Sequence, residues 1–326
     1  MLRGLRRLNR YEKRMLDVVK KGKGLVRLKQ IGFSRKTKEG FRFPIHALEI
    51  GNPSALRKHP AGLVAGVHGL EIIGIQILLD FIESIVNEDF VPDIRKGKIG
   101  LHCIPVINPG GVALKRRSNP GGVDLMRNSG VEAVDPLPFF GGHRISRNLP
   151  YFRGQGLEPE SRALTRWVIE SFFEVKNSLI PVVDLHSGFG SVDHVWWPYA
   201  GTHDPCIDAP LFQKLADRLR VYSGHDRFRY GPQSESYTTH GDLWDRLYNQ
   251  YQVRPEASKL KSRFLPLTLE VGTWTELREK PSRMLDPKNI FNPPPQTKSE
   301  TVIRYRRFLR DTILLAREKP GDRIWN

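Results

Sequence analysis

Residues Gly62–Glu71 read GLVAGVHGLE, and both the fold and the chemistry of the chain are organised around this stretch. An apolar run this short, ended by a turn, indicates a buried central strand. His68 and Glu71 follow the run directly, where the strand ends and a helix over about residues 71–86 is expected. Because α/β proteins place their chemistry at the carboxyl edge of the sheet, we interpret these side chains as two of three zinc ligands.

Three further apolar runs have the same character. Ile99–Ile107 ends at the turn Asn108–Gly111, Leu179–His186 ends on a histidine, and Phe264–Val271 carries Glu270 near its end. Helical segments alternate with these strands, which favours a largely parallel sheet whose carboxyl ends converge. The residues expected to meet there are His68, Glu71, His186 and Glu270.

The chain is expected to be an α/β protein with one domain, in which helices flank a central mixed, largely parallel twisted sheet. Leu25–Ser34 and Phe41–Ile50, separated by a polar turn, resemble an antiparallel hairpin. Residues 281–298 are proline-rich and expected to be irregular. We divide the chain into a basic N-terminal helical arm (1–24) and a catalytic domain (25–326). The arm is either a helix docked on the domain or a surface-binding element.

Composition limits the classes of protein to which the chain can belong. Its 326 residues, 39% of them hydrophobic, suffice for one large core, and no apolar run is long enough to predict a membrane span. The N-terminus lacks the apolar core of a secretory signal, and the two cysteines are too few for a disulfide framework. We therefore expect a cytoplasmic protein.

The net charge of +17 allows three interpretations. They are a solvated basic surface, a preference for acidic small substrates, and binding to nucleic acid or anionic lipid. Aromatic residues do not alternate with the basic runs in a stacking pattern, so nucleic-acid binding is the least favoured.

The strand-end residues suit metal-assisted hydrolysis. A catalytic zinc takes three protein ligands and keeps one position for water, and two histidines with one carboxylate are an established ligand set. A separate carboxylate must then accept the proton of the water. Glu270 fits this role, because a carboxylate on an otherwise apolar strand is costly to bury without a partner. The alternative for Glu270 is a salt bridge to an arginine.

Longer motifs occur in a consistent order along the chain. His68–Glu71 is an HxxE motif, Asn108–Gly111 is a tight turn, and Arg117–Asn128 reads RSNPGGVDLMRN. Leu267–Glu270 ends in a T-x-E pattern, and His186 follows Glu71 at a long interval. Together these motifs resemble the zinc carboxypeptidases of the M14 type in their short bacterial form, over residues from about 25 to 317.

The resemblance implies a cofactor and a catalytic set. One zinc ion per chain would be bound, Glu270 would be the general base, and Arg117 would stabilise the oxyanion. Asp124 would accept a hydrogen bond from the ligand His68 and fix its tautomer. The implied zinc ligands are His68, Glu71 and His186.

The resemblance also implies substrate contacts. Arg127 would grip a substrate carboxylate, Tyr237 would close over the substrate, and Trp244 would line the side-chain pocket. Tyr248 is the alternative mobile tyrosine, although its spacing is less suitable.

Met126 departs from the family pattern, because an asparagine stands beside the carboxylate-binding arginine in the family. Methionine cannot donate a hydrogen bond to a carboxylate, so the clamp would be weakened or rebuilt from Arg144 or Arg147.

The favoured function is a zinc metallopeptidase that hydrolyses a peptide or amide bond next to a carboxylate-bearing residue. Its partners would be peptides or small amides, with no nucleic acid expected and the oligomeric state left open. One alternative is an N-acyl amino acid deacylase similar to desuccinylases and aspartoacylases. Another is a basic binding protein that has kept the fold and lost the activity.

Overall fold

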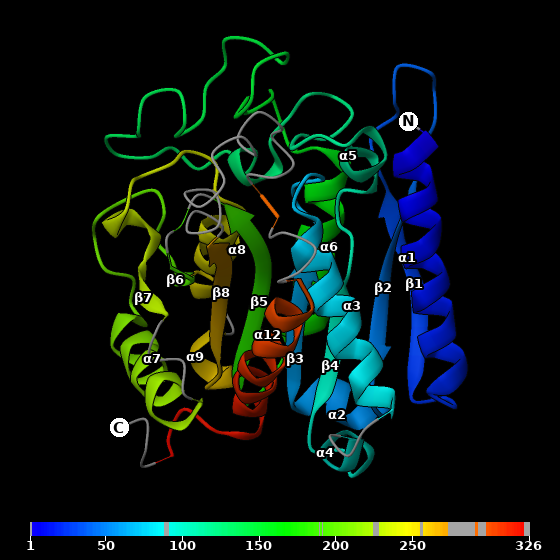
Figure 1. The fold of residues 1–326 in the computed structure, drawn as a ribbon. Helices are drawn as coiled ribbons and strands as arrows, with labels where there is room; N and C mark the ends of the chain where they lie inside the picture. The colour runs from blue at the N-terminus through cyan, green and yellow to red at the C-terminus, as the bar shows by residue number, and fades with distance from the viewer. Residues whose placement is uncertain are drawn as a thin grey trace.

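The computed structural model describes residues 2–87, 91–188, 190, 192–223, 228–254, 257–272, 291–292 and 298–322. Within them, eight strands form one mixed sheet in the order β1-β2-β4-β3-β5-β8-β6-β7 (Figure 1). The strands are β1 Val26–Phe33, β2 Pro44–Ile50, β3 Pro60–Ala65, β4 Gly100–Ile104, β5 Leu179–Gly188, β6 His194–Trp197, β7 Arg229–Pro232 and β8 Arg263–Gly272. Helices flank this sheet, so the expected fold class is confirmed.

The centre of the sheet is parallel. β4, β3, β5 and β8 run side by side in one direction, whereas β2 and β6 join them antiparallel. Every residue of β3 and β5 is buried, which explains why these strands are near-continuous apolar runs in the sequence. Because the central strands are parallel, their carboxyl ends lie at the same edge of the sheet.

The helices cover both faces of the sheet. α1 (Leu2–Lys21), α3 (Ile72–Asn87), α12 (Lys298–Ile313) and α7 (Ala209–Ser223) lie in a row on one face, and α6 (Pro159–Phe172) and α8 (Leu243–Gln252) lie on the other (Figure 1). Shorter helices are α2 Pro53–Lys58, α4 Val91–Arg95, α5 Pro109–Leu114 and α9 Ala257–Leu260; the 3₁₀ turns are Leu125–Arg127, Gln233–Glu235 and Leu314–Arg317. Among the described helices, none has the length and apolar character that crossing a bilayer requires.

The hairpin expected near the N-terminus is present, because β1 pairs antiparallel with β2 from Val26 opposite Ile50 to Phe33 opposite Pro44. β6 and β7 were not predicted, since four residues are too few to show a strand period. The proline-rich residues 281–290 and 293–297 lie outside the described part of the chain.

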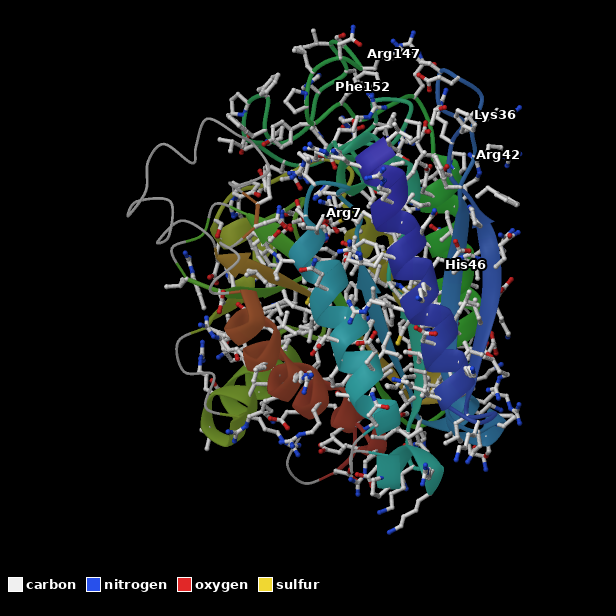
Figure 2. All side chains as sticks on the ribbon, turned by 45° about the vertical axis from the view of Figure 1, so that its right-hand side comes forward. Arg7, Lys36, Arg42, His46, Arg147 and Phe152 are labelled. Carbon is white, nitrogen blue, oxygen red and sulfur yellow. The ribbon has the colours of Figure 1, made fainter. Side chains whose placement is uncertain are left out.

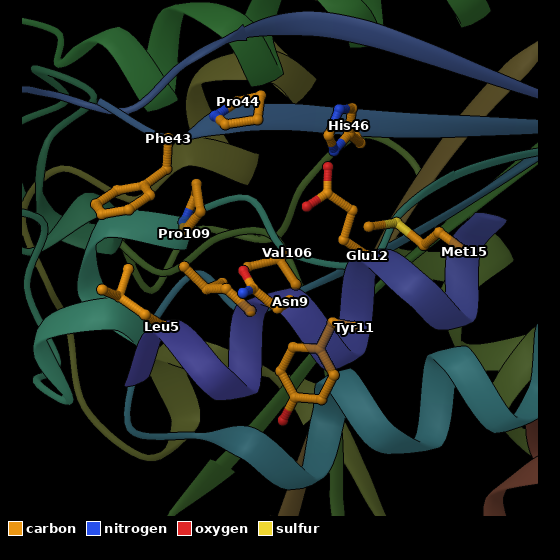
Figure 3. Close-up of a pocket in the computed structure, with 11 residues that line it drawn as sticks. Leu5, Asn9, Tyr11, Glu12, Met15, Phe43, Pro44, His46, Val106 and Pro109 are labelled. Carbon is orange, nitrogen blue, oxygen red and sulfur yellow. The ribbon is translucent and has the colours of Figure 1, made fainter. Parts of the chain in front are cut away.

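The basic N-terminal helix α1 packs on the domain. Its buried side chains include Tyr11, Met15 and Val18, and it contacts α3 and α5. Gly4 permits the close approach to α5, because a Cβ there would lie 2.0 Å from the carbonyl oxygen of Ala113. Figure 3 shows one side of α1 facing the start of β2, whereas Tyr11 points the other way, toward α3. The division of the chain at residue 24 stays a prediction.

Candidate metal centre

The proposed ligands His68, Glu71 and His186 meet at the carboxyl edge of the sheet. His68 follows β3, Glu71 precedes α3, and His186 lies on β5. One potential ligand atom from each lies within 4.8 Å of the others, and all three residues are buried. The Nδ1 atom of His68 is 2.6 Å from Glu71 Oε1, and the Nδ1 atom of His186 is 3.0 Å from Glu71 Oε2.

The remaining ring nitrogens contact carboxylates. His68 Nε2 lies 3.0 Å from Asp124 Oδ1, and His186 Nε2 lies 2.9 Å from Asp184 Oδ2. When Nε2–H donates to these carboxylates, each Nδ1 keeps a lone pair that faces Glu71. Carboxylates that orient ligand histidines in this way are typical of zinc sites. Two imidazoles and one carboxylate therefore form a donor set that fits zinc.

The charges of the cluster depend on one another. Burial acts to raise the pKa of Glu71, but His68 and His186 outweigh it and hold the pKa below its ordinary value. Burial acts to lower the pKa of His186, whereas Asp184 and Glu71 hold it well above its ordinary value. Without a metal ion, a proton thus supplies the positive charge that the carboxylates require, and a divalent cation would displace it.

Arg117 links the cluster to its surroundings. Its Nε donates to Asp124 Oδ2 at 2.8 Å, and its Nη1 donates to Glu71 Oε1 at 3.3 Å. The guanidinium also lies 5.0 Å from the centre of the Tyr151 ring. Burial acts against the charge of Asp124, but Arg117 and His68 hold the pKa of Asp124 well below its usual range. The side chain of Arg117 is thus a fixed cation beside the proposed ligands.

Glu270 lies beside the cluster on the neighbouring strand β8. It is the register partner of His186, so the two side chains leave the same face of the sheet. A Cβ on Gly188 would lie 2.4 Å from Glu270 Oε1, so glycine at that position leaves room for the carboxylate. Burial and the nearby Glu71 carboxylate raise the pKa of Glu270 to about 8.

The two tyrosine candidates lie in different surroundings. Burial raises the pKa of Tyr237, and the charges that act on it belong to Arg127, Glu270 and Arg117, which places this tyrosine near the proposed site. Tyr248 is fully buried, and its hydroxyl donates to Asp208 Oδ2 at 2.8 Å. The structure therefore brings Tyr237 to the site and holds Tyr248 in the core.

The arginines considered for a carboxylate clamp also differ. Arg127 is buried, and its guanidinium donates to the carbonyl oxygens of Phe140 and Met126. Arg144 is exposed and pairs with Glu132 at 3.2 Å. Arg144 and Arg147 both line a cavity of about 690 Å³ that does not include Arg127.

The contact of Asp184 with His186 at the site was not predicted. Trp244, expected to line the substrate pocket, is buried and donates its indole N–H to Asp184 Oδ2 at 2.9 Å. Asp184 therefore joins Trp244 to the ring of His186. The D-L-H pattern of residues 184–186 could have indicated this contact, because residues two apart on a strand point to the same face of the sheet. Lining of the pocket by Trp244 stays a prediction.

Comparison with solved structures agrees with this architecture. The chain is similar to bovine thrombin-activatable fibrinolysis inhibitor, solved in complex with tick carboxypeptidase inhibitor, with 17% identity, coverage of 95% of this chain and 96% of that chain, and a TM-score of 0.70. It is also similar to carboxypeptidase A from Helicoverpa armigera, with 18% identity, coverage of 93% and 71%, and a TM-score of 0.65. A metallo-carboxypeptidase from Pseudomonas aeruginosa gives 14% identity, coverage of 92% and 67%, and a TM-score of 0.56.

At such identities the structural similarity establishes the fold alone. No curated protein sequence matches the chain. Residues 11–297, however, match the sequence pattern of the zinc carboxypeptidases, which is most of the chain. This match agrees with the resemblance of the individual motifs, and the chain therefore belongs to the zinc carboxypeptidase family.

Proposed function

We propose that this protein is a zinc-dependent peptidase that hydrolyses a peptide or amide bond next to a carboxylate-bearing residue. The observation that carries the proposal is the buried cluster of two imidazoles and a carboxylate, with the Glu270 strand position directly alongside. One zinc ion per chain would be held by His68, Glu71 and His186. When bound, zinc supplies Lewis-acid polarisation of the scissile carbonyl and lowers the pKa of water.

Glu270 is the proposed general base. It would accept a proton from the attacking water and deliver it to the leaving amine. In the metal-free protein the pKa of Glu270 is raised to about 8, which brings it near neutral pH, where one group can both accept and deliver a proton, and this supports the role. Its register pairing with His186 supports its place beside the reacting carbonyl.

Arg117 is the proposed electrophilic partner of the carbonyl oxygen. Its hydrogen bonds to Asp124 and Glu71 keep the guanidinium in place before the substrate arrives. A fixed cation stabilises the negative charge that develops on the oxygen in the transition state. Asp124 and Asp184 hold the two imidazole rings in orientation.

Arg127 is the proposed contact for the substrate carboxylate. Three of its five N–H donors are directed at main-chain oxygens, which leaves one N–H on each terminal nitrogen. Two such donors match the two oxygens of a carboxylate. Met126 has no side-chain donor, so the guanidinium of Arg127 would bind the carboxylate without the asparagine amide that the family has at this position. Tyr237 would close over the bound substrate.

The variant Glu270→Gln tests the mechanism. Turnover of N-blocked dipeptides should fall by a factor on the order of 10³, while zinc content stays at one ion per chain. The control Glu174→Gln changes an exposed glutamate and should leave turnover intact. Full activity of Glu270→Gln with zinc bound would rule out this mechanism.

Substrates with free and amidated C-termini test the carboxylate contact. The free acid should be preferred, and Arg127→Gln should remove most of the preference by raising KM. Arg144→Gln is the matched control, and an effect as large as that of Arg127→Gln would favour the rebuilt clamp instead. Faster turnover of N-acyl amino acids than of dipeptides would favour the deacylase function.

We further propose that the enzyme is cytoplasmic, which the two free, buried cysteines Cys103 and Cys206 support. For the proposed basic helical arm (1–24), the packing of α1 on α3 and α5 supports the docked-helix alternative, and its division from a catalytic domain (25–326) stays a proposal.

A further inference from the structure

A cavity of about 480 Å³ lies over the outer face of α3, between α1 and α12. The contacts of α3 with both neighbouring helices make α3 the floor and α1 and α12 the walls. Figure 2 shows Arg7 at the upper end of this arrangement, on the side of α1 near α3. We call the cavity the arginine trough, after the residues Arg7, Arg10 and Arg14 of α1 and Arg306 of α12 that line it.

The cations of the trough outnumber its acids. Arg306 pairs with Asp80 on the floor at 2.6 Å, and Arg14 forms two hydrogen bonds with Glu83 at 2.6 and 2.7 Å. Among the described residues, no carboxylate forms an ion pair with Arg7 or Arg10. Two guanidinium groups that face one cavity thus have no counter-charge from the described part of the chain.

The arrangement on α1 separates two surfaces. Arg7, Arg10 and Arg14 follow each other at intervals of three and four residues, so they occupy one face of the helix. The opposite face packs Leu5 and Met15 toward the start of β2 (Figure 3). The face of α1 that lines the trough therefore carries charged side chains, although two other helices adjoin the trough.

Uncharged polar groups of α1 and α3 also line the trough. The hydroxyl of Tyr11 and the Oε1 atom of Gln76 are buried without a hydrogen bond of ordinary geometry among the described residues, although Gln76 lies close enough to Tyr11 to lower its pKa. Burial raises the pKa of Tyr11, while the charges of Arg7 and Arg14, the nearby Gln76 and the charge of Arg10 act to lower it. Ile72, Val302 and Ile303 also line the trough, but a wholly apolar occupant would leave the Tyr11 hydroxyl and the guanidinium groups without polar partners.

We propose that the arginine trough binds a ligand with two or more phosphate groups, held by Arg7 and Arg10. The planar guanidinium fork matches phosphate oxygens in bidentate geometry, and its weak hydration lowers the cost of binding. The volume lies within the range of about 300–1,000 Å³ that is typical of small-molecule sites. The phosphates would belong to a free small molecule or to a lipid headgroup.

The trough is distinct from the metal centre. None of its lining residues is a proposed zinc ligand or substrate contact. The two sites nevertheless share α3, because Ile72 lines the trough and directly follows Glu71 in the chain.

Calorimetric titration of the zinc-loaded chain of residues 1–326 with tripolyphosphate tests the proposal. The salt should be about 150 mM, where non-specific attraction is screened beyond about 8 Å. Saturable binding is expected, and Arg7→Gln/Arg10→Gln should weaken it by about tenfold or more, since hydrogen bonds to charged groups are strong. The matched control Arg3→Gln/Arg6→Gln removes the same charge from exposed positions on the same helix and should change affinity by less than about twofold.

A second variant separates geometry from charge. Arg7→Lys/Arg10→Lys keeps the charge but loses the planar forks, so its affinity should fall between those of the wild type and the glutamine variant. Unchanged zinc content and circular dichroism show that the variants are folded. The proposal is overturned if the wild type shows no saturable binding to tripolyphosphate or to vesicles. It is also overturned if Arg7→Gln/Arg10→Gln and the control Arg3→Gln/Arg6→Gln lose affinity equally. Binding only to vesicles that contain cardiolipin, whose headgroup carries two phosphate groups, with the same dependence on Arg7 and Arg10, identifies a lipid headgroup as the source of the phosphate.

Discussion

Two charged clusters adjoin α3, and they are built in opposite ways. In the metal centre, His68, Glu71 and His186 are buried and contact one another or a further carboxylate. In the arginine trough, which is open to solvent, Arg7 and Arg10 have no carboxylate partner among the described residues. The first cluster balances its charge internally, whereas the second carries an excess.

The difference follows from the cost of an unbalanced charge. Leaving one charge unpaired in a buried site costs about 3–5 kcal/mol, so a buried cluster must be complete before it is stable. Near water the same imbalance is screened and costs little. A balanced buried cluster therefore fixes geometry, as catalysis requires, while an exposed excess leaves charge available for a ligand.

The largest expected effect is on the metal centre when Glu71 is replaced. Glu71→Gln removes the carboxylate that both Nδ1 atoms face, so zinc affinity should fall by more than the roughly 100-fold upper limit for an outer hydrogen-bond partner. Competition with a fluorescent chelator measures the change. Glu83→Gln, which removes the partner of Arg14, is the control and should leave zinc affinity unchanged. Equal affinities of both variants would contradict the assignment of Glu71 as a ligand.

The next effect concerns the carboxylate that holds His186. Asp184→Asn should lower zinc affinity by about 10–100-fold, because the imidazole loses its charged partner. The same chelator competition applies, and the exposed Asp204 provides the control variant Asp204→Asn. Wild-type affinity in Asp184→Asn would show that the ring is oriented by packing alone.

Changing pH should separate the two clusters. The pKa of His186 is raised, so below that pKa zinc must displace a proton, and its affinity should rise by about tenfold per pH unit. The rise should level off once His186 is neutral. Phosphate binding in the trough should depend much less on the protonation state of the protein, because the arginine side chains stay charged. Zinc affinity that is constant between about pH 5.5 and 7 would mean that His186 carries no proton in the metal-free protein.

The smallest effect is expected on stability when the trough loses charge. Arg7→Gln/Arg10→Gln should change the free energy of unfolding by no more than about 0.5 kcal/mol, because neither arginine has a described carboxylate partner to lose. Urea denaturation measures this change. A loss of about 2 kcal/mol or more would show that these arginines support the fold instead of a ligand.

Several elements could be predicted from the sequence because their signals are local. β3, β5 and β8 are buried parallel strands, so each is a nearly uninterrupted apolar run. The spacing of His68 and Glu71 places both at one strand-to-helix junction. β6 and β7 had no such signal, since four residues cannot display a period.

By itself, the sequence determined which residues stand at strand ends and that two imidazoles and a carboxylate are available for a metal. Only the tertiary structure decided that the Nδ1 atoms face Glu71, and that Asp184 and Trp244 hold the ring of His186. It also decided that arginines from the first and last helices line one cavity. The reason is physical: side-chain periodicity is encoded along each element, whereas the meeting of distant side chains depends on the order of the strands and the packing of the helices.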